Sequence, residues 1–276
     1  MEDYNRGMES STNRRVYRFR LEPTCEQEQG FRQFAGARRW LWNWALEQRQ
    51  QYYQQTRKTI SRQELSARLT ALKHQPEGAW LREVDAQLLQ QVLIDLHRAF
   101  VNFFAKRARY PRFKSRKRDQ ARFRIPQRVR VVGGRVQVPK IGRVRLRLSQ
   151  PVEGQTKSAT FKQDACGHWH VSLVAEMTGP LPALPVPTVE RAVGLDLGLK
   201  DAVVLSDGTR EPAPRFYRRA ERKLRRAQRA HSRRQKGSRN KARARQRPAR
   251  IHQRVANQRA DVSDKLSTRS RSPCPP

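Results

Sequence analysis

Residues 192–208 read AVGLDLGLKDAVVLSDG, and this stretch decides how the C-terminal third of the chain is interpreted. Apolar residues alternate with glycine and Asp196, which predicts one strand, and residues 201–205 predict a second strand folded back on it. The dipeptide Asp207-Gly208 is typical of a hairpin turn. We therefore expect one carboxylate, that of Asp196, in the middle of an apolar strand of a β-meander.

A carboxylate in this position suits the chemistry of a metal-dependent phosphodiester nuclease. Carboxylates on a sheet hold Mg²⁺ ions that position the attacking water and stabilise the leaving oxygen, and Asp196 is the candidate first ligand. Gly194 and Gly198 on either side would let a phosphate or another backbone approach closely. The alternative is structural, in which Asp196 caps a turn or pairs with a neighbouring arginine, and the spacing does not distinguish the two.

The charge balance of the chain indicates a polyanionic partner. Its 276 residues include 60 Lys and Arg against 24 Asp and Glu, a net charge of +36, which favours nucleic acid binding. No apolar run approaches the roughly 20 residues of a membrane span, and no signal peptide opens the chain. Cys25, Cys166 and Cys274 are too far apart for a zinc ribbon or a disulfide framework. These features predict a cytoplasmic nucleic-acid-binding protein with free thiols and no membrane partner.

The spacing of apolar residues changes twice in the first half of the chain. Residues 1–13 are polar and expected to be disordered. Residues 14–23 alternate apolar and basic side chains, which predicts the first strand of a sheet. Helical spacing through residues 24–109 then predicts a small bundle of three helices, the first capped by Thr24.

Residues 110–179 begin with the basic loop YPRFKSRKR at 110–118 and continue as a run of short strands. The lone strand at 14–23 can join them, which predicts a β-barrel interrupted by the helical insertion. Four prolines between 180 and 187 mark residues 180–190 as a linker.

The segment after the meander is strongly basic. Between residues 215 and 259 there are 19 Lys and Arg and one acid, Glu221. A disordered basic tail is one interpretation, but apolar residues at helical spacing on both sides of residues 236–238 favour two basic helices. Pro248 falls inside the second helix and is expected to break or kink it.

Two smaller groups of side chains have both a functional and a structural interpretation. Trp40 and Trp44 are four residues apart on one helix face and favour the core, which leaves Trp42 as the surface candidate for stacking on bases. His168 and His170 share one face of a strand, but no third metal ligand lies nearby in sequence, so we interpret them as ordinary strand residues.

Several motifs recur in a characteristic order along about residues 14–268. They are VYRFRLEPT, RRWLWNWAL, YPRFKSRK, VGLDLGLKDAVVLSDG, KLRRAQRAHSRRQKGSRNKARAR and HQRVANQRADVSDKLST. In this order they closely resemble the TnpB family, the OrfB-type proteins of bacterial insertion sequences that are often termed transposases.

The resemblance implies an α+β multidomain fold. A wedge-like, OB-like β-barrel with a helical recognition insertion would precede a RuvC-like α/β domain of the RNase H type at residues 191–268. The implied activity is RNA-guided DNA cleavage in DNA transposition and recombination, with Mg²⁺ as cofactor and with a guide RNA from the transposon end and a target DNA duplex as partners.

The resemblance also implies roles for individual residues. Asp196 matches the first catalytic acid and thereby a Mg²⁺ ligand. The nucleic-acid-binding residues would lie in two basic segments and comprise Lys114, Arg116, Lys117, Arg118, Arg222, Arg225, Arg226 and Arg229.

The family pattern continues beyond residue 268 through a catalytic glutamate, a four-cysteine zinc ribbon and a final catalytic aspartate. Residues 269–276 instead read RSRSPCPP, an aberrant tail that resembles a frameshift or premature-stop product. We therefore expect an incomplete RuvC-like domain without the zinc ribbon. Two-metal hydrolysis needs several converging carboxylates, and Asp201 and Asp207 are expected to serve turns.

Three functional hypotheses follow. The chain is a truncated, nuclease-deficient member of the RNA-guided endonuclease lineage, or a guide-RNA- or DNA-binding regulator without catalysis, or a non-functional pseudogene product.

Overall fold

The computed structural model describes residues 13–177, 194–206 and 208–269. They fall into two compact units, one within Met1–Leu181 and one within Pro182–Pro276. The segments interpreted as a disordered N-terminus, a proline-rich linker and an aberrant tail lie outside these residues, apart from Asn13 and Arg269. Asn13 begins the first strand of the first unit, and Arg269 ends the last helix of the second.

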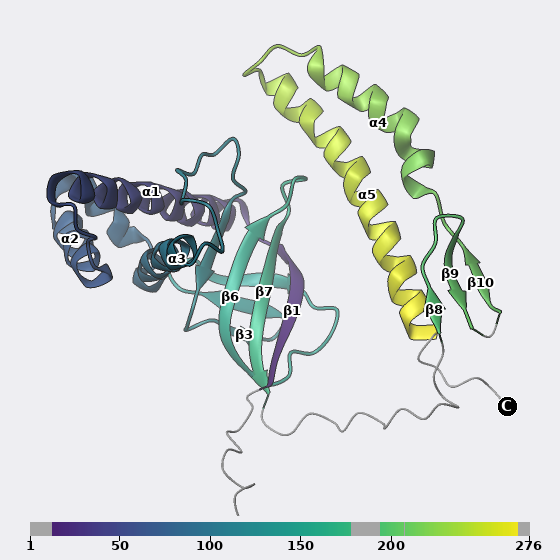
Figure 1. Cartoon of the computed structure of the whole chain (residues 1–276), viewed down its shortest axis with the longest axis horizontal. Helices are drawn as coiled ribbons and strands as arrows, with labels where there is room; N and C mark the ends of the chain where they lie inside the picture. The colour runs from purple at the N-terminus through teal and green to yellow at the C-terminus, as the bar shows by residue number, and fades with distance from the viewer. Residues whose placement is uncertain (1–12, 178–193, 207, 270–276) are drawn as a thin grey trace, which may run out of the picture. The chain divides into compact units, whose positions relative to one another are not determined.

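Seven antiparallel strands form a curled sheet in the first unit (Figure 1). Their order is β2-β6-β7-β1-β5-β4-β3, so the N-terminal strand lies at the centre, between β7 and β5. The strands are β1 (Asn13–Glu22), β2 (Arg122–Ile125), β3 (Arg130–Val132), β4 (Arg135–Val138), β5 (Gly142–Arg147), β6 (Gln155–Gln163) and β7 (Trp169–Met177).

The alternating pattern of β1 sets which face of that strand meets the core. Tyr17, Phe19 and Leu21 are buried, whereas Arg18 between them is exposed. Successive side chains of a strand point to opposite faces, so one face of β1 is apolar and the other basic. The short strand β2, with residues RFRI, begins a few residues after the basic loop and pairs with β6 at one edge of the sheet.

Three helices lie between β1 and β2 in the sequence and pack beside the sheet in Figure 1. Side-chain caps fix where they begin. The Thr24 hydroxyl accepts the Gln27 N–H while the Gln27 side chain accepts the Thr24 N–H, a capping box, and Ser61 and Asp85 cap the next two helices. The elements are α1 (Cys25–Thr56), α2 (Arg62–His74), the 3₁₀ helix η1 (Pro76–Glu83) and α3 (Ala86–Phe104).

Phe31 on α1 joins the helical layer to the sheet. Its ring centroid lies 5.0 Å from that of Trp169, 5.4 Å from that of Phe161 and 5.6 Å from that of Phe123. All four rings are buried, and they belong to one hydrophobic core that includes residues of the helices and of the sheet. The bundle and the sheet are therefore held together by a shared core.

The second unit combines a small sheet with a helical hairpin. Strands β8 (Leu195–Asp196), β9 (Asp201–Leu205) and β10 (Arg210–Pro212) pair antiparallel in the order β10-β9-β8. Helices α4 (Phe216–Ser232) and α5 (Arg239–Arg269) pack against each other. The interpretation of residues 215–259 as two basic helices is confirmed.

Helix α5 is continuous through Pro248, so of the expected break or kink the break is wrong. Proline removes one hydrogen bond, to the carbonyl of Ala244, and the turns on either side keep theirs. Among the residues described, no helix is long and apolar enough to cross a membrane.

Candidate nucleic-acid interface

The basic loop, residues 110–118, is fastened to helix α1. The Trp42 indole Nε1–H donates to the carbonyl of Arg112 at 3.0 Å. The Asn43 side chain binds the Lys114 backbone twice, donating to its carbonyl at 2.9 Å and accepting its N–H at 2.7 Å. These bonds hold the loop backbone in place without using its basic side chains.

The end of the basic loop turns back on itself and presents three cations. The Ser115 N–H donates to the Asp119 carboxylate at 2.8 Å, and the Arg118 N–H donates to the Ser115 hydroxyl. Arg116, Lys117 and Arg118 follow this anchor and are exposed. A preformed loop with exposed cations costs little ordering entropy when a phosphate binds it.

Lys114 differs from the other predicted nucleic-acid-binding residues because it is partly buried. Its ammonium lies 4.0 Å from the ring centroid of Trp42, a cation–π contact. Burial, together with the charge of nearby Arg38, lowers the pKa of Lys114 to about 8, while Asp119 opposes the shift. Lys114 thus holds the loop against α1 and is less available to a phosphate than its neighbours.

The prediction that Trp42 is a surface residue is wrong. Its side chain is only 7% exposed. Trp40 is the more exposed ring at 37%, and it stacks on Trp44 and meets Trp80 edge-on. The basic loop covers Trp42, and helical periodicity within α1 carries no information about a segment 70 residues later in the chain.

Four predicted arginines project from α4. Leu224 and Ala227 on this helix are buried, and the arginines occupy the remaining positions and are exposed. Arg225 also pairs with Glu221 at 2.8 Å, an exposed contact worth little energy. The four are Arg222, Arg225, Arg226 and Arg229.

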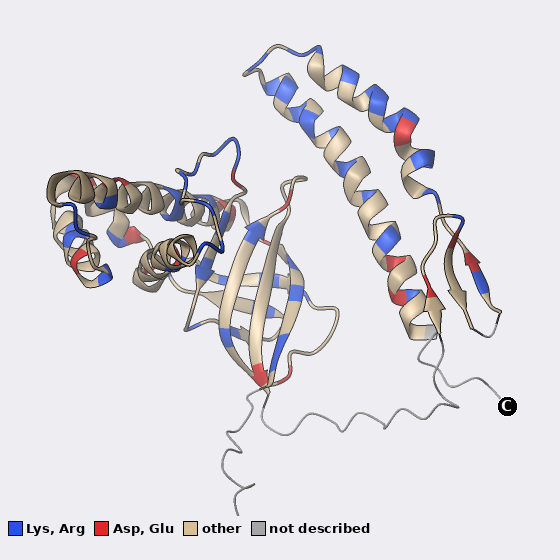
Figure 2. Cartoon of the chain, in the orientation of Figure 1, with Lys and Arg blue, Asp and Glu red and all other residues tan. Residues whose placement is uncertain are grey.

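Positive charge continues on the first two thirds of α5, as Figure 2 shows. Residues 239–259 carry eight Lys and Arg and no Asp or Glu, whereas Asp261 and Asp264 follow near the C-terminal end. We call α4 together with residues 239–259 the basic hairpin. Its length and charge suit contact with a nucleic acid backbone.

Asp196 lies on β8, the two-residue edge strand, and is exposed, so the expectation of an acid within a buried strand is not met in this unit. It pairs with Val204 of β9, which pairs in turn with Arg210 of β10. Directly opposed residues share a sheet face. Asp196, Val204 and Arg210 therefore form a row across the three strands on one face of the sheet, with Asp196 at one end and the cation of Arg210 at the other.

The other described acids of this sheet lie on its opposite face. Asp201 is three residues before Val204, and Glu211 pairs with Val203, so strand alternation directs both away from the Asp196 face. Asp207 lies outside the described residues. Gly198 approaches the carbonyl of Asp201 so closely that a Cβ there would lie 2.8 Å from the oxygen, which supports the backbone interpretation of this glycine.

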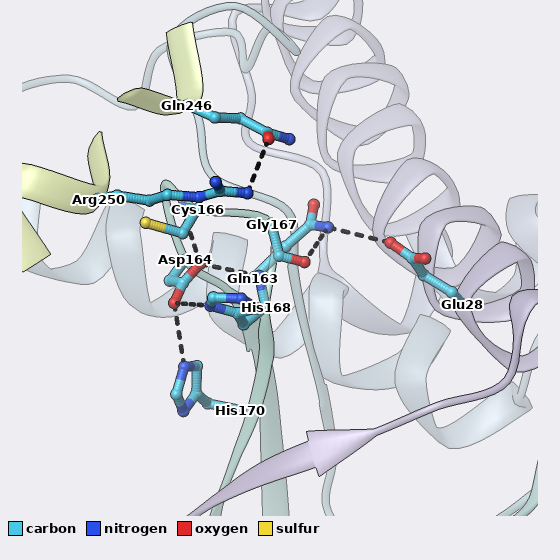
Figure 3. A network of polar contacts seen from close by, with 9 residues as sticks. All are labelled: Glu28, Gln163, Asp164, Cys166, Gly167, His168, His170, Gln246 and Arg250. Atoms are coloured by element: carbon cyan, nitrogen blue, oxygen red, sulfur yellow. Dashed lines mark hydrogen bonds and ion pairs between the residues drawn. The ribbon is translucent and has the colours of Figure 1, made fainter. Parts of the chain in front are cut away.

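His168 and His170 share a partner that the sequence interpretation missed. One oxygen of the Asp164 carboxylate accepts the backbone N–H groups of Cys166 and His168, and the other contacts the imidazoles of His168 and His170 at 3.3 and 3.2 Å (Figure 3). Burial lowers the pKa of His170, and the Asp164 contact opposes this. An aspartate before a glycine between two strands is a turn signal, and Asp164 closes the β6–β7 turn.

Comparisons with known proteins match most of the chain to one family. A family model described as a probable transposase of the OrfB type (IS605) matches residues 151–269, and the helix-turn-helix domain model of the same family matches residues 11–58. A putative RNA-guided DNA endonuclease of Streptomyces pristinaespiralis is 38% identical over 260 residues, covering 93% of this chain. The chain belongs to the TnpB family of OrfB-type transposases.

A second TnpB relative, the putative RNA-guided DNA endonuclease InsQ of Escherichia coli K12, is 37% identical over 211 residues, or 76% of this chain. The matches cover 51% of InsQ and 64% of the Streptomyces protein, so the chain spans about half to two thirds of its relatives' length. A solved CRISPR-Cas12f ternary complex is matched at 12% identity and TM-score 0.39, over 83% of this chain and 57% of that one, a similarity too low to define the fold.

The helix-turn-helix description does not correspond to the observed structure of this TnpB chain. The described residues of the matched segment form strand β1 and one 32-residue helix, α1. The helix ends at Arg57, whose positive φ of 56° marks a left-handed cap. An N-terminal DNA-reading motif of two short helices is therefore absent from residues 13–58.

The Mg²⁺ ions implied for TnpB nucleases do not fit the carboxylates described here. Within the described ranges no group of three or more His, Cys, Asp and Glu side chains could hold a metal ion. The cation of Arg210 ends the row that Asp196 begins. A two-ion site requires several carboxylates converging on one point, and Asp196 alone does not provide them.

Proposed function

We propose that this chain binds RNA and duplex DNA as a member of the RNA-guided DNA endonuclease lineage. The observation that carries the proposal is the basic hairpin, a pair of packed helices with six exposed arginines on α4 alone. Support comes from the basic loop fastened to α1 and from two relatives whose names describe putative RNA-guided DNA endonucleases. A guide RNA from the transposon end and a target DNA duplex are the expected partners.

The finer architecture is part of the same proposal. The curled sheet would be the wedge-like, OB-like barrel, built from residues 14–23 and 110–179, with residues 24–109 as the helical recognition insertion. Residues 191–268 would be the N-terminal part of a RuvC-like domain of the RNase H type, with Asp196 as its first acid. The order of motifs along the chain and the antiparallel pairing of β1 with β7 and β5 support this assignment.

A second candidate, binding without cleavage, is favoured by the position of Asp196. The other described carboxylates of its sheet lie on the opposite face. In this candidate the 276-residue chain acts as a guide-RNA- or DNA-binding regulator, and cleavage needs carboxylates from outside the described residues.

The binding proposal is tested by the salt dependence of RNA affinity. Changing Arg222, Arg225, Arg226 and Arg229 to Gln removes four exposed cations, and the slope of log K against log salt should fall by about 0.7 for each lost contact with single-stranded RNA. The control changes four exposed sheet arginines, Arg130, Arg135, Arg145 and Arg147, to Gln and removes the same net charge. Equal effects of the two variants would contradict a specific role for the basic hairpin.

Cleavage is tested separately with a labelled target duplex, the transposon-end RNA and Mg²⁺. The second candidate predicts RNA-dependent binding of the duplex without cutting, both by the chain and by its Asp196→Ala variant. Cutting that Asp196→Ala abolishes would exclude this candidate and assign catalysis to the chain itself.

A further inference from the structure

Four aromatic rings gather where α3 ends and the basic loop begins. Phe103 lies 5.3 Å from both Phe104 and Tyr110, measured between ring centroids. Phe100 lies beneath them, 5.5 Å from Tyr110 and 6.2 Å from Phe104. We call Phe103, Phe104 and Tyr110 the aromatic platform.

The platform faces solvent although its members are apolar. Phe104 is 65% exposed and Tyr110 is 45% exposed, and Phe103 is half-buried. Exposed rings of this size that touch one another are typical of a binding surface and not of a core. They would lose water-exposed apolar area on contact with a flat ligand.

The basic residues around the platform indicate which class of ligand it would bind. Residues 96–118 contain nine Lys and Arg and no Asp or Glu. Lys106, Arg107 and Arg109 lie between Phe104 and Tyr110 in the sequence, and all three are exposed. An apolar protein partner gains nothing from such a concentration of cations, whereas a nucleotide combines a flat base with an anionic phosphate.

Arg49 provides an independent indication of an anionic ligand. Its side chain is buried, only 6% exposed, with the guanidinium 4.7 Å above the ring of Phe100. Its Nε has no hydrogen-bond partner, and no ion pair found in the described ranges includes Arg49. Burial lowers the pKa of Arg49, while Tyr110 opposes the shift. A buried cation without a counter-charge keeps the potential under the platform positive.

We propose that the aromatic platform stacks unpaired bases of single-stranded RNA. This inference deepens the proposed function and rests on it. Bases in duplex DNA are covered by their neighbours, whereas folded RNA exposes unpaired bases in loops and ends that stack on aromatic side chains. Phe104 and Tyr110 are the most exposed rings of the platform and would contact the bases, and the nearby cations would bind the flanking phosphates.

The test uses the full chain and a short single-stranded RNA that carries 5-iodouridine, which cross-links under light to an aromatic ring stacked on it. Peptide mapping should locate the adduct at Phe104 or Tyr110. The double variant Phe104→Leu with Tyr110→Leu keeps apolar bulk and removes the rings, and it should lose the adduct and bind the RNA about tenfold more weakly. Val101→Ala, at an exposed apolar position of the same helix, is the control and should retain both.

The outcomes separate the platform from the general binding function. Tight RNA binding with adducts only at other residues, or an adduct yield unchanged in the Leu variant, would overturn the platform and leave the proposed function intact. Adducts formed with single-stranded DNA but not with RNA would overturn the RNA assignment. Absence of any RNA binding would remove the proposed function and the platform with it.

Discussion

The two units differ most in how much apolar surface each encloses. In the first unit, helices and sheet share one core in which Phe31 touches three rings of the sheet. In the second, the buried apolar side chains among the described residues are Val203, Leu224, Ala227 and Val255. The first unit is therefore a self-supporting scaffold, and the second derives little stability from a core.

The two units also differ in how they place their basic side chains. The first unit also exposes cations, but it pairs or packs some of them, as with Lys114 over Trp42. The basic hairpin places its arginines close together in solvent, where like charges repel and destabilise the folded form. A ligand that binds only the folded form adds stability by mass action, so a polyanion should stabilise the second unit much more than the first.

The largest expected effect tests the core of the first unit. Phe31→Ala should lower its free energy of unfolding by about 3–5 kcal/mol, because a buried ring shared by helix and sheet is lost. Leu224→Ala in α4 is the matched change in the second unit and should cost about 2 kcal/mol, at the low end for a buried leucine. Hydrogen exchange resolved by peptide measures each unit separately. A larger loss from Leu224→Ala would reverse the comparison.

Pro248 offers a stabilising change in the second unit. Pro248→Ala should restore a hydrogen bond to the Ala244 carbonyl and raise the stability of α5 by about 3 kcal/mol, the difference between proline and alanine in a helix interior. The measurement is hydrogen-exchange protection of α5 peptides. Ala249→Gly is the control of opposite sign, with an expected loss of about 1 kcal/mol. Unchanged protection in Pro248→Ala would show that the proline costs this helix nothing.

The smallest expected effect is a pH dependence of stability that arises from Lys114. This cation is partly buried in the first unit, whereas the arginines of the basic hairpin in the second unit are exposed. Burial lowers its pKa from 10.5 to about 8 in the folded chain. Between these values the unfolded chain retains the proton and the folded chain releases it, so stability contributed by this group rises with pH. Below pH 8 both forms are protonated and the desolvation cost is present in full.

Lys114→Met should remove this rise. The unfolding free energies of wild type and variant are measured in urea near pH 7 and near pH 9.5. Relative to the variant, the wild type should be more stable at pH 9.5 than at pH 7. Lys117→Met, at an exposed position of the same loop, is the control. A difference that stays constant over this range would contradict the buried position of the Lys114 ammonium.

Local sequence signals predicted most of the elements. Thr24, Ser61 and Asp85 begin helices α1, α2 and α3 as caps. The hairpin of β3 and β4 turns at Gly133-Gly134, where both residues have positive φ. The 3₁₀ helix η1 lies outside the predicted bundle of three helices, because a segment of eight residues has no periodicity long enough to detect.

The candidate site depended on contacts that no local pattern contains. The sequence located the basic segments and Asp196, but Trp42 was misplaced because the loop that covers it comes from residues 110–118. The platform of Phe103, Phe104 and Tyr110 likewise depends on a chain reversal after α3.

The sequence by itself determined the family, the excess of positive charge and the periodicity of the helices and strands, because these are properties of composition and of residues close together in the chain. Only the tertiary structure decided which cations are exposed, which tryptophan is covered and which face of a sheet carries Asp196. Burial and strand register arise from segments far apart in sequence, and the free energy of a charge or a ring depends on what surrounds it.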